Sequence, residues 1–396
     1  MLIQLTQTAA LSASQDLVTR AEQVALVAAE HADDVDVRGR FPREAMAALK
    51  AERLLGAMVP ARLGGEGASI TELAEVCHRL GQACASTAMI FAMHQIKAAC
   101  LVKHYEGSAW HADFLRELAI SQLLLASSTT EGQGGGDVRN SIAPVERDGA
   151  TIRLERAATV MSYGAQADAV VTTARRAPDA APSDQVLVVF RAGDYRLTET
   201  STWETLGMRG TRSAGFAMAA EGHELQVLPQ PYAEIHAQTM TPVAHLLWSS
   251  VWAGVAAGAV ERARLFIRKA ARSGQTPPAA AHFNRAAGQL RQLRALVTAA
   301  LTRYEAIRED AAALSAFDFQ TEITLLKVEA SELALSAVMS AMRTCGLSGY
   351  RNDGAASQGR ALRDILSAPI MINNDRILAN LGASAVMAET PRGLFA

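Results

Sequence analysis

The sequence predicts an α+β protein of three parts, because the spacing of its apolar residues changes twice along the chain. Helical spacing runs through residues 1–122, strand-like alternation marks residues 123–237, and helical spacing returns over residues 238–396. We therefore expect an N-terminal α-helical domain, a mostly antiparallel middle β domain and a C-terminal four-helix bundle.

Composition narrows the class of protein. The 396 residues are enough for two or three domains, and 49% hydrophobic content with only 5% aromatic residues favours helices. A formal net charge of −2 gives no indication of nucleic acid or an anionic membrane as a partner. The chain does not open on a cationic segment followed by an apolar core, so we expect no signal peptide and a cytoplasmic protein.

The cysteines and the longest apolar run both predict buried segments of a protein in a reducing compartment. The four cysteines lack CxxC or Cys/His metal spacing, so we expect buried thiols in a reducing compartment and no metal site. The apolar run Val243–Val260 carries the polar residues His245, Ser249 and Ser250. It therefore predicts a buried core helix rather than a transmembrane span.

Start and stop signals place the helices. Ser69 and Glu72 have the spacing of a capping box. The stretch of roughly Ala85–Tyr105 carries His94 and is apolar nearly all round, which predicts a long buried helix. Thr241-Pro242 is typical of an N-cap and first helical residue, and Gly346 of a helix end.

A glycine-rich stretch, Ser127–Val138, follows a short apolar run of strand character. Glycine lets the backbone approach a flat or charged ligand closely, and successive free N–H groups can hold an anionic edge. Thr129 and Thr130 add hydroxyls that both donate and accept. Composition alone also fits a flexible surface loop. No Gly-Lys-Ser/Thr follows and no βαβ pattern surrounds the stretch, which excludes a phosphate loop and a dinucleotide fingerprint.

The residues Thr130–Val138, Thr-Glu-Gly-Gln-Gly-Gly-Gly-Asp-Val, resemble without a gap the Thr-Glu-Pro-Gly-Ala-Gly-Ser-Asp-Val signature of the acyl-CoA dehydrogenase superfamily. Further stretches resemble the same family in the same order, namely Phe41–Gly67, Leu206–Ser213, Ala341–Tyr350 and Arg363-Asp364. The resemblance runs from about Glu30 onward. It implies that family's fold, with a barrel-like middle β domain between two helical domains.

The resemblance implies FAD as the cofactor, buried between the β domain and the bundle. The positions that match cofactor contacts in the family are Thr129, Thr130, Gly135, Gly136, Ser162, Arg272, Arg343, Gly346 and Asn374. Ser162 would contact flavin N5, and Arg272 would reach the pyrophosphate of FAD in a neighbouring subunit, which implies a homo-oligomer, a tetramer or a dimer. From the residues alone, Ser162 also fits an ordinary strand-end serine, and Arg272 a cation that opposes the helix dipole.

The carboxylate base of the family has no counterpart here. After Arg363-Asp364 and seven further residues, the position of the family's glutamate holds Ile372. Some members carry the glutamate instead on the helix that begins here at Pro242, and the matching position, close to Trp248, is not a base either. General base catalysis contributes roughly 10²–10⁴-fold, so the ordinary mechanism lacks a main component.

Two residues are candidates to replace the base. His94 lies in a stretch that resembles both ordinary dehydrogenases and flavin monooxygenases of this fold, in which a histidine of this helix lines the ring pocket. Its alternative role is a core histidine hydrogen-bonded to the backbone. Asp375 stands three residues beyond Ile372, and an N-cap role is the alternative for it.

Three functions stay open from the sequence. The first is an FAD-dependent acyl-CoA or acyl-carrier thioester dehydrogenase with a displaced base. The second is a reduced-flavin monooxygenase on the same fold, supplied by a separate flavin reductase. The third is a non-catalytic flavin-binding homologue. The partners expected are an acyl thioester or another small molecule, with an electron acceptor or reductase, and neither nucleic acid nor a membrane.

Overall fold

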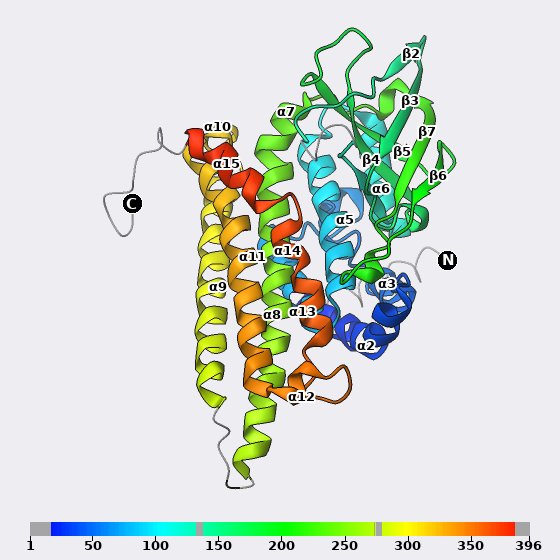
Figure 1. Cartoon of the computed structure of the whole chain (residues 1–396). Coiled ribbons are helices and arrows are strands. Elements are labelled where there is room, and N and C mark those ends of the chain that lie inside the picture. Colours follow the sequence, from blue (N-terminus) through cyan, green and yellow to red (C-terminus); the bar gives the residue numbers. More distant parts are fainter. Residues whose placement is uncertain (1–16, 132–137, 273, 275–278, 385–396) are drawn as a thin grey trace.

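The computed structural model describes residues 17–131, 138–272, 274 and 279–384. The chain forms helices, then two β-sheets, then a bundle of long helices, as Figure 1 shows. This order confirms the predicted three-part architecture. The β-sheets lie beside one end of the bundle, and the helix α5 (Ala85–His104) runs between the two.

The N-terminal part consists of helices that surround α5. Their bounds are α2 (Leu17–Arg38), α3 (Arg43–Ala51), α4 (Ile70–Ala83), α5 (Ala85–His104) and α6 (Ala109–Ser121). The predicted capping box begins α4, since the Ser69 hydroxyl accepts from the Glu72 N–H at 3.2 Å and the Glu72 carboxylate accepts from the Ser69 N–H at 2.8 Å. Helix α5 is buried on nearly every face, as its apolar composition predicts.

The middle part holds two sheets. The strands are β1 (Leu125–Ser128), β2 (Glu146–Asp148), β3 (Thr151–Ala158), β4 (Ala169–Arg175), β5 (Gln185–Arg191), β6 (Tyr195–Ser201) and β7 (Gly215–His223). One sheet has the order β1-β4-β5, with β1 parallel to β4, and the other has the order β2-β3-β7-β6 and is antiparallel throughout. Strands β4 and β5 are buried along most of their length, so they read as continuous apolar runs.

The C-terminal part is built on three long helices that run up and down beside one another (Figure 1). The elements are α7 (Tyr232–Ile235), α8 (Thr241–Arg272), α9 (Ala280–Ile307), α10 (Ala311–Ser315), α11 (Phe317–Cys345), α12 (Leu347–Tyr350), α13 (Gly359–Ile365), α14 (Ser367–Ile370) and α15 (Asn374–Ser384). Helix α8 also packs closely on α4: a Cβ on Gly254 would lie 2.2 Å from the His78 carbonyl oxygen, so glycine is required at this crossing.

One helix start differs from its prediction. Thr241 is not an N-cap, because a π-helical turn over His236–Met240 joins α7 to α8 without a break. The resulting helical stretch Tyr232–Arg272 and helix α5 are the two described segments long and apolar enough to cross a membrane. Their most apolar windows are 94% and 89% buried inside the fold, as expected of core helices.

The segment after α12 is fixed to the β domain. Asp364 accepts the Met208 N–H at 2.6 Å, and the Arg363 guanidinium pairs with Asp36. Gly207 packs against this segment so closely that a Cβ would lie 2.1 Å from the Arg363 carbonyl oxygen. These contacts hold α13 and α14 beside the β domain and thereby shape one wall of the cavity described next.

Candidate functional site

A cavity with a volume of about 580 Å³ lies where the three parts of the chain meet. Helix α5, the segments after β1 and β3, the turn before β7, the start of α8 and the segment after α14 all contribute side chains. The volume is within the range of about 300–1,000 Å³ typical of small-molecule sites.

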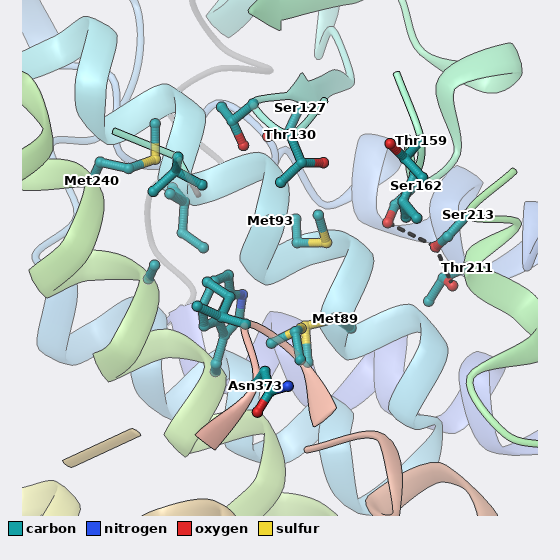
Figure 2. Close-up of a pocket in the computed structure, with 18 of the residues that line it drawn as sticks. Met89, Met93, Ser127, Thr130, Thr159, Ser162, Thr211, Ser213, Met240 and Asn373 are labelled. Carbon is teal, nitrogen blue, oxygen red and sulfur yellow. Dashed lines mark hydrogen bonds between the residues drawn. The ribbon is translucent and has the colours of Figure 1, made fainter. Parts of the chain in front are cut away.

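One wall of the cavity carries hydroxyl groups. Its members come from the β domain and are Ser127, Thr129, Thr130, Thr159, Ser162, Thr211 and Ser213. Figure 2 shows three of them linked in a chain: the hydroxyls of Ser162 and Ser213 lie 2.8 Å apart, as do those of Ser213 and Thr211. The Thr211 hydroxyl donates to the Met208 carbonyl, which fixes the direction of the chain.

Apolar side chains line much of the remaining surface. Met89, Met93 and Ile96 enter from α5, and Met240 enters from the turn before α8 (Figure 2). Two buried polar atoms in the lining, the Trp248 indole nitrogen and the Tyr232 hydroxyl, have no partner among the described residues. A hydroxyl wall, an apolar wall and unpartnered donors together suit a flat heteroaromatic group such as a flavin ring.

The only carboxylate that lines the described cavity, Glu131, is already fully engaged. It pairs with the buried Arg156 at 3.1 Å, and it accepts hydrogen bonds from the Ser141 hydroxyl at 3.0 Å and from the Ile142 and Ala143 N–H groups at 2.6 and 3.3 Å. Both oxygens of the Glu131 carboxylate therefore already accept hydrogen bonds from the described residues. Glu131 thus holds the segment 141–143 in place and does not act as a free base.

The two positions that match the family's base lie at this cavity. Ile372, in the turn between α14 and α15, occupies one of them, and the other is on α8 close to Trp248, which lines the cavity as well. Ile372 has φ of 59°, a left-handed conformation that is a genuine outlier for a β-branched residue. In the folded cavity, as in the sequence, neither position supplies a carboxylate.

His94 does not lie in the cavity, so its prediction as the replacement base is wrong. Its ring is fully buried between α5 and β1, where Nε2–H donates to the Leu55 carbonyl at 2.8 Å and Nδ1 accepts from the Leu125 N–H at 3.1 Å. Burial lowers the pKa of His94 to about 4. It is a neutral structural histidine, the alternative that the sequence left open.

Asn374 does not face the cavity either. Its amide accepts from the Lys327 amine at 2.6 Å and donates to Ser331 and Glu332 at 3.0 Å each, so it is buried in a network behind the site. Its predicted cofactor contact is wrong in this structure.

The neighbouring Asn373 lines the cavity instead, and its side chain caps α15 by accepting from the N–H groups of Asp375 and Arg376. Asp375 is therefore not the N-cap and lies outside the cavity lining.

The predicted pyrophosphate residues lie far from the cavity within one chain. Arg272 ends the 32-residue helix α8, and the last residue of this helix that lines the cavity is Trp248, so about 36 Å of helix separate Arg272 from the cavity at 1.5 Å per residue. Arg343 and Gly346 end α11 beside α12, also away from the site (Figure 1). Contact with a cofactor in a neighbouring subunit stays a prediction for them. Gly135 and Gly136 lie outside the described residues, whereas Thr129, Thr130 and Ser162 line the cavity.

Sequence reasoning missed the basic and phenolic groups of the site. Lys97, Tyr232, His236 and His245 all line the cavity. The His245 Nδ1–H donates to the Ile323 carbonyl at 2.8 Å, and burial lowers its pKa to about 4, so the ring is neutral with Nε2 unprotonated. Among the described residues, no group of three or more His, Cys, Asp or Glu side chains is arranged to hold a metal ion.

Comparison with protein families identifies the class. The family model for the acyl-CoA dehydrogenase N-terminal domain matches residues 14–120, and that for the C-terminal domain matches residues 237–387. The two matches together span more than half of the chain. The chain belongs to the acyl-CoA dehydrogenase superfamily of flavin-dependent oxidoreductases, which confirms the resemblance found in the sequence.

Individual relatives within this class differ in chemistry. The chain is 27% identical over 184 residues to cyclohex-1-ene-1-carbonyl-CoA dehydrogenase of Geobacter metallireducens, a match that spans 46% of this chain and about half (48%) of that protein. It is 23% identical to 3-sulfinopropanoyl-CoA desulfinase of Paraburkholderia xenovorans over 86% of this chain and 88% of that protein. The FMN-bound dibenzothiophene monooxygenase TdsC of Paenibacillus sp. A11-2 superimposes with a TM-score of 0.82 at 18% identity, covering 95% of this chain and 98% of that one, and so shares its fold.

Proposed function

We propose that this protein is a two-component flavin monooxygenase, which uses reduced flavin from a separate reductase to insert oxygen into a small, largely apolar substrate. One oxygen atom of O₂ enters the substrate and the other leaves as water, and the electron pair comes from the reduced flavin. The observation that carries the proposal is that Ile372, at one family base position, and Trp248, close to the other, both line the cavity and neither is a carboxylate. Such a site is poorly equipped to remove an α-proton.

The chain's own residues suit the binding half of this reaction. Thr129, Thr130 and Ser162 would hold the polar edge of the flavin ring, and Met89 and Met93 would cover an apolar face. The buried hydroxyl chain that begins at Ser162 is pre-organised by its own hydrogen bonds. When bound, flavin supplies the electron pair. The likeness to FMN-bound TdsC makes FMN, beside the FAD expected from the sequence, a cofactor to test.

A second candidate is the acyl thioester dehydrogenase expected first from the sequence, with a non-standard base. One observation favours it: burial lowers the pKa of the Lys97 amine to about 8, within reach of a general base at mildly alkaline pH. The relatives that are named dehydrogenases support the same reaction class. A neutral amine in the cavity would have to take the proton that a glutamate takes elsewhere in the family.

The test compares oxygen insertion with desaturation. Protein loaded with FMN or FAD is reduced under nitrogen and mixed with ¹⁸O₂ and a panel of small thiophenes, sulfinates and aromatic amines, and the products are analysed by mass. We expect one ¹⁸O atom in a product of at least one substrate. Desaturation of an acyl-CoA under nitrogen, with no ¹⁸O product from any panel member, would contradict the proposal and favour the second candidate.

The proposed oligomer has its own check. The sequence-based expectation of a tetramer or dimer rests in part on Arg272, which lies about 36 Å of helix away from the cavity of its own chain. We propose that Arg272 serves the cofactor of a neighbouring subunit. Sedimentation of flavin-loaded protein as a stable monomer would contradict this proposal.

A further inference from the structure

One wall of the cavity contains a lysine without a counter-charge. Lys97 lines the cavity from α5, and its side chain is almost completely buried. Its only hydrogen-bond partner among the described residues is the Met240 sulfur, at 3.4 Å. A thioether is a weak acceptor, and a buried ammonium is costly unless it is paired. The fold therefore keeps a cation in the cavity without providing it with an anion from the described chain.

Two further donors accompany Lys97. The Tyr232 hydroxyl lines the cavity, is buried, and has no partner in the described part of the chain. Burial raises its pKa, so it stays a neutral donor. Behind the lining, Arg156 uses its Nη1 for Glu131, Ser141 and Thr173, while its Nε and Nη2 are buried and unpartnered in the described structure.

Among the described residues, the charge balance of the cavity lining is positive, because Lys97 and Arg376 are both part of it. Glu131 is neutralised by Arg156, and no other carboxylate among the described residues lines the cavity. Lys97 and Tyr232 both line the same cavity, and Arg156 pairs with Glu131 in its lining. A site with surplus positive charge and an unpartnered neutral donor is complementary to an anion, since charge-assisted hydrogen bonds would satisfy both donors at once.

We propose that the substrate carries an anionic group, a carboxylate or an oxyacid of sulfur, which binds to the Lys97 amine and the Tyr232 hydroxyl. The apolar residues Met89, Met93 and Ile96 on the same helix would contact the body of the substrate. This inference rests on the proposed function only in placing substrate and flavin in one cavity. The anion site is compatible with either redox reaction. Binding measurements therefore test the anion site, and turnover measurements test the proposed function.

The binding test uses a pair of probes of equal shape and different charge. Hexanoate and hexanamide are titrated by calorimetry into flavin-loaded wild-type protein, Lys97→Met and Lys103→Met. Lys103 is on the same helix but at the surface, so it controls for the loss of a lysine from α5. We expect wild type and Lys103→Met to prefer hexanoate by about tenfold or more, and Lys97→Met to lose that preference, since hydrogen bonds to charged groups are worth this much.

A second arm separates a substrate anion from the phosphate of the flavin itself. The affinities of FMN and riboflavin are compared in wild type and in Lys97→Met. If Lys97 serves the substrate, the ratio of the two affinities is the same in both proteins. A ratio that falls about tenfold in Lys97→Met would assign Lys97 to the cofactor phosphate and overturn the proposal.

Folding does not confound these tests. Removal of an unpaired buried cation relieves its desolvation cost, so Lys97→Met is expected to melt no lower than wild type. Equal affinity of wild type for hexanoate and hexanamide would overturn the anion site even if oxygen insertion is found. A hexanoate preference that depends on Lys97, together with no oxygen insertion, would uphold the anion site and defeat the proposed function alone.

Discussion

The chain buries two lysines in very different surroundings. Lys327, on α11, donates to the Ala368 carbonyl at 3.0 Å and to the Asn374 amide oxygen at 2.6 Å, and its amine lies 5.7 Å from the centre of the Trp252 ring. Lys97, on α5, has only the Met240 sulfur as a partner among the described residues. Burial lowers the pKa of each to about 8.

The difference separates a structural cation from a binding one. The partners of Lys327 come from α14 and α15, so this lysine fastens the C-terminal segment to the bundle and lies outside the cavity lining. Lys97 makes no such bridge to another segment through a strong acceptor among the described residues, and it faces the cavity. The two lysines therefore have similar pKa shifts but different roles. Their hydrogen-bond partners, rather than the shifts, distinguish the structural Lys327 from the ligand-binding Lys97.

The largest expected effect comes from adding the missing carboxylate to the cavity of Lys97. Ile372→Glu restores a base at the family position, so anaerobic flavin reduction by a simple acyl-CoA should rise by about 100-fold or more over wild type. The change also removes a β-branched residue from a left-handed backbone position. Bleaching of the flavin absorbance in a stopped-flow instrument measures the rate.

The matched control is Ile370→Glu, which places a carboxylate on the same cavity wall two residues away. It should leave the rate of flavin reduction near that of wild type, since general base catalysis depends on geometry. An equal increase in both variants would mean that any added negative charge suffices and that the family base position has no special role here.

The two lysines should differ in their contributions to stability. Lys327→Met leaves the Asn374 oxygen and the Ala368 carbonyl without their buried donor, so we expect a loss of about 3 kcal/mol in the free energy of unfolding and a melting temperature several degrees lower. Lys97→Met should leave the melting temperature equal or higher. Calorimetry of both ligand-free variants, beside wild type, checks the pair; a larger loss in Lys97→Met would reverse the assignment of roles.

The pH dependence of stability isolates Lys97. Its folded-state pKa of about 8 lies below the usual 10.5, so between these values the unfolded chain binds a proton that the folded chain has released. Wild type should therefore gain stability relative to Lys97→Met as pH rises from about 8 to 10.5, by at most about 1.4 kcal/mol per pH unit. The other titratable groups around the cavity are common to both proteins and cancel in the difference; they are Cys100, Glu131, Arg156, Tyr232, His236, His245 and Arg376.

The smallest effect concerns the neutral donor beside Lys97. Tyr232→Phe removes one hydroxyl, so the affinity for hexanoate should fall by about two- to tenfold, as expected for a hydrogen bond from a neutral group. The affinity for hexanamide should change less. A loss of hexanoate binding as large as that in Lys97→Met would show that the phenol, rather than the amine, is the main anion contact.

The fold was predictable because it depends on patterns that the sequence displays over long stretches. The change from helical to alternating spacing and back located the β domain, and Ser69 with Glu72 marked the start of α4. The prediction that Thr241-Pro242 begins a helix was wrong, since these residues continue a helix after a π-helical turn. Local residue preference does not reveal whether the preceding segment is already helical.

The site was predictable only in part, and helix α5 shows why. Met89, Met93 and Lys97 follow one another at spacings of four, and Ile96 lies three residues after Met93, so they share the face that lines the cavity. His94 is one residue beyond Met93, about 100° around the helix, and faces β1 instead. Because α5 is apolar on nearly every side, its sequence does not indicate which face lies on a cavity and which on a sheet.

The most direct test of the central claim, that this site lacks the base of an acyl-CoA dehydrogenase, needs only the wild-type protein. Flavin-loaded protein is mixed under nitrogen with excess straight-chain octanoyl-CoA at pH 7, and the oxidised flavin spectrum is followed over minutes. The account predicts that the spectrum keeps its oxidised form, because Trp248 and Ile372 supply no carboxylate and Glu131 is engaged by Arg156. Rapid and complete bleaching of the wild-type flavin would contradict it.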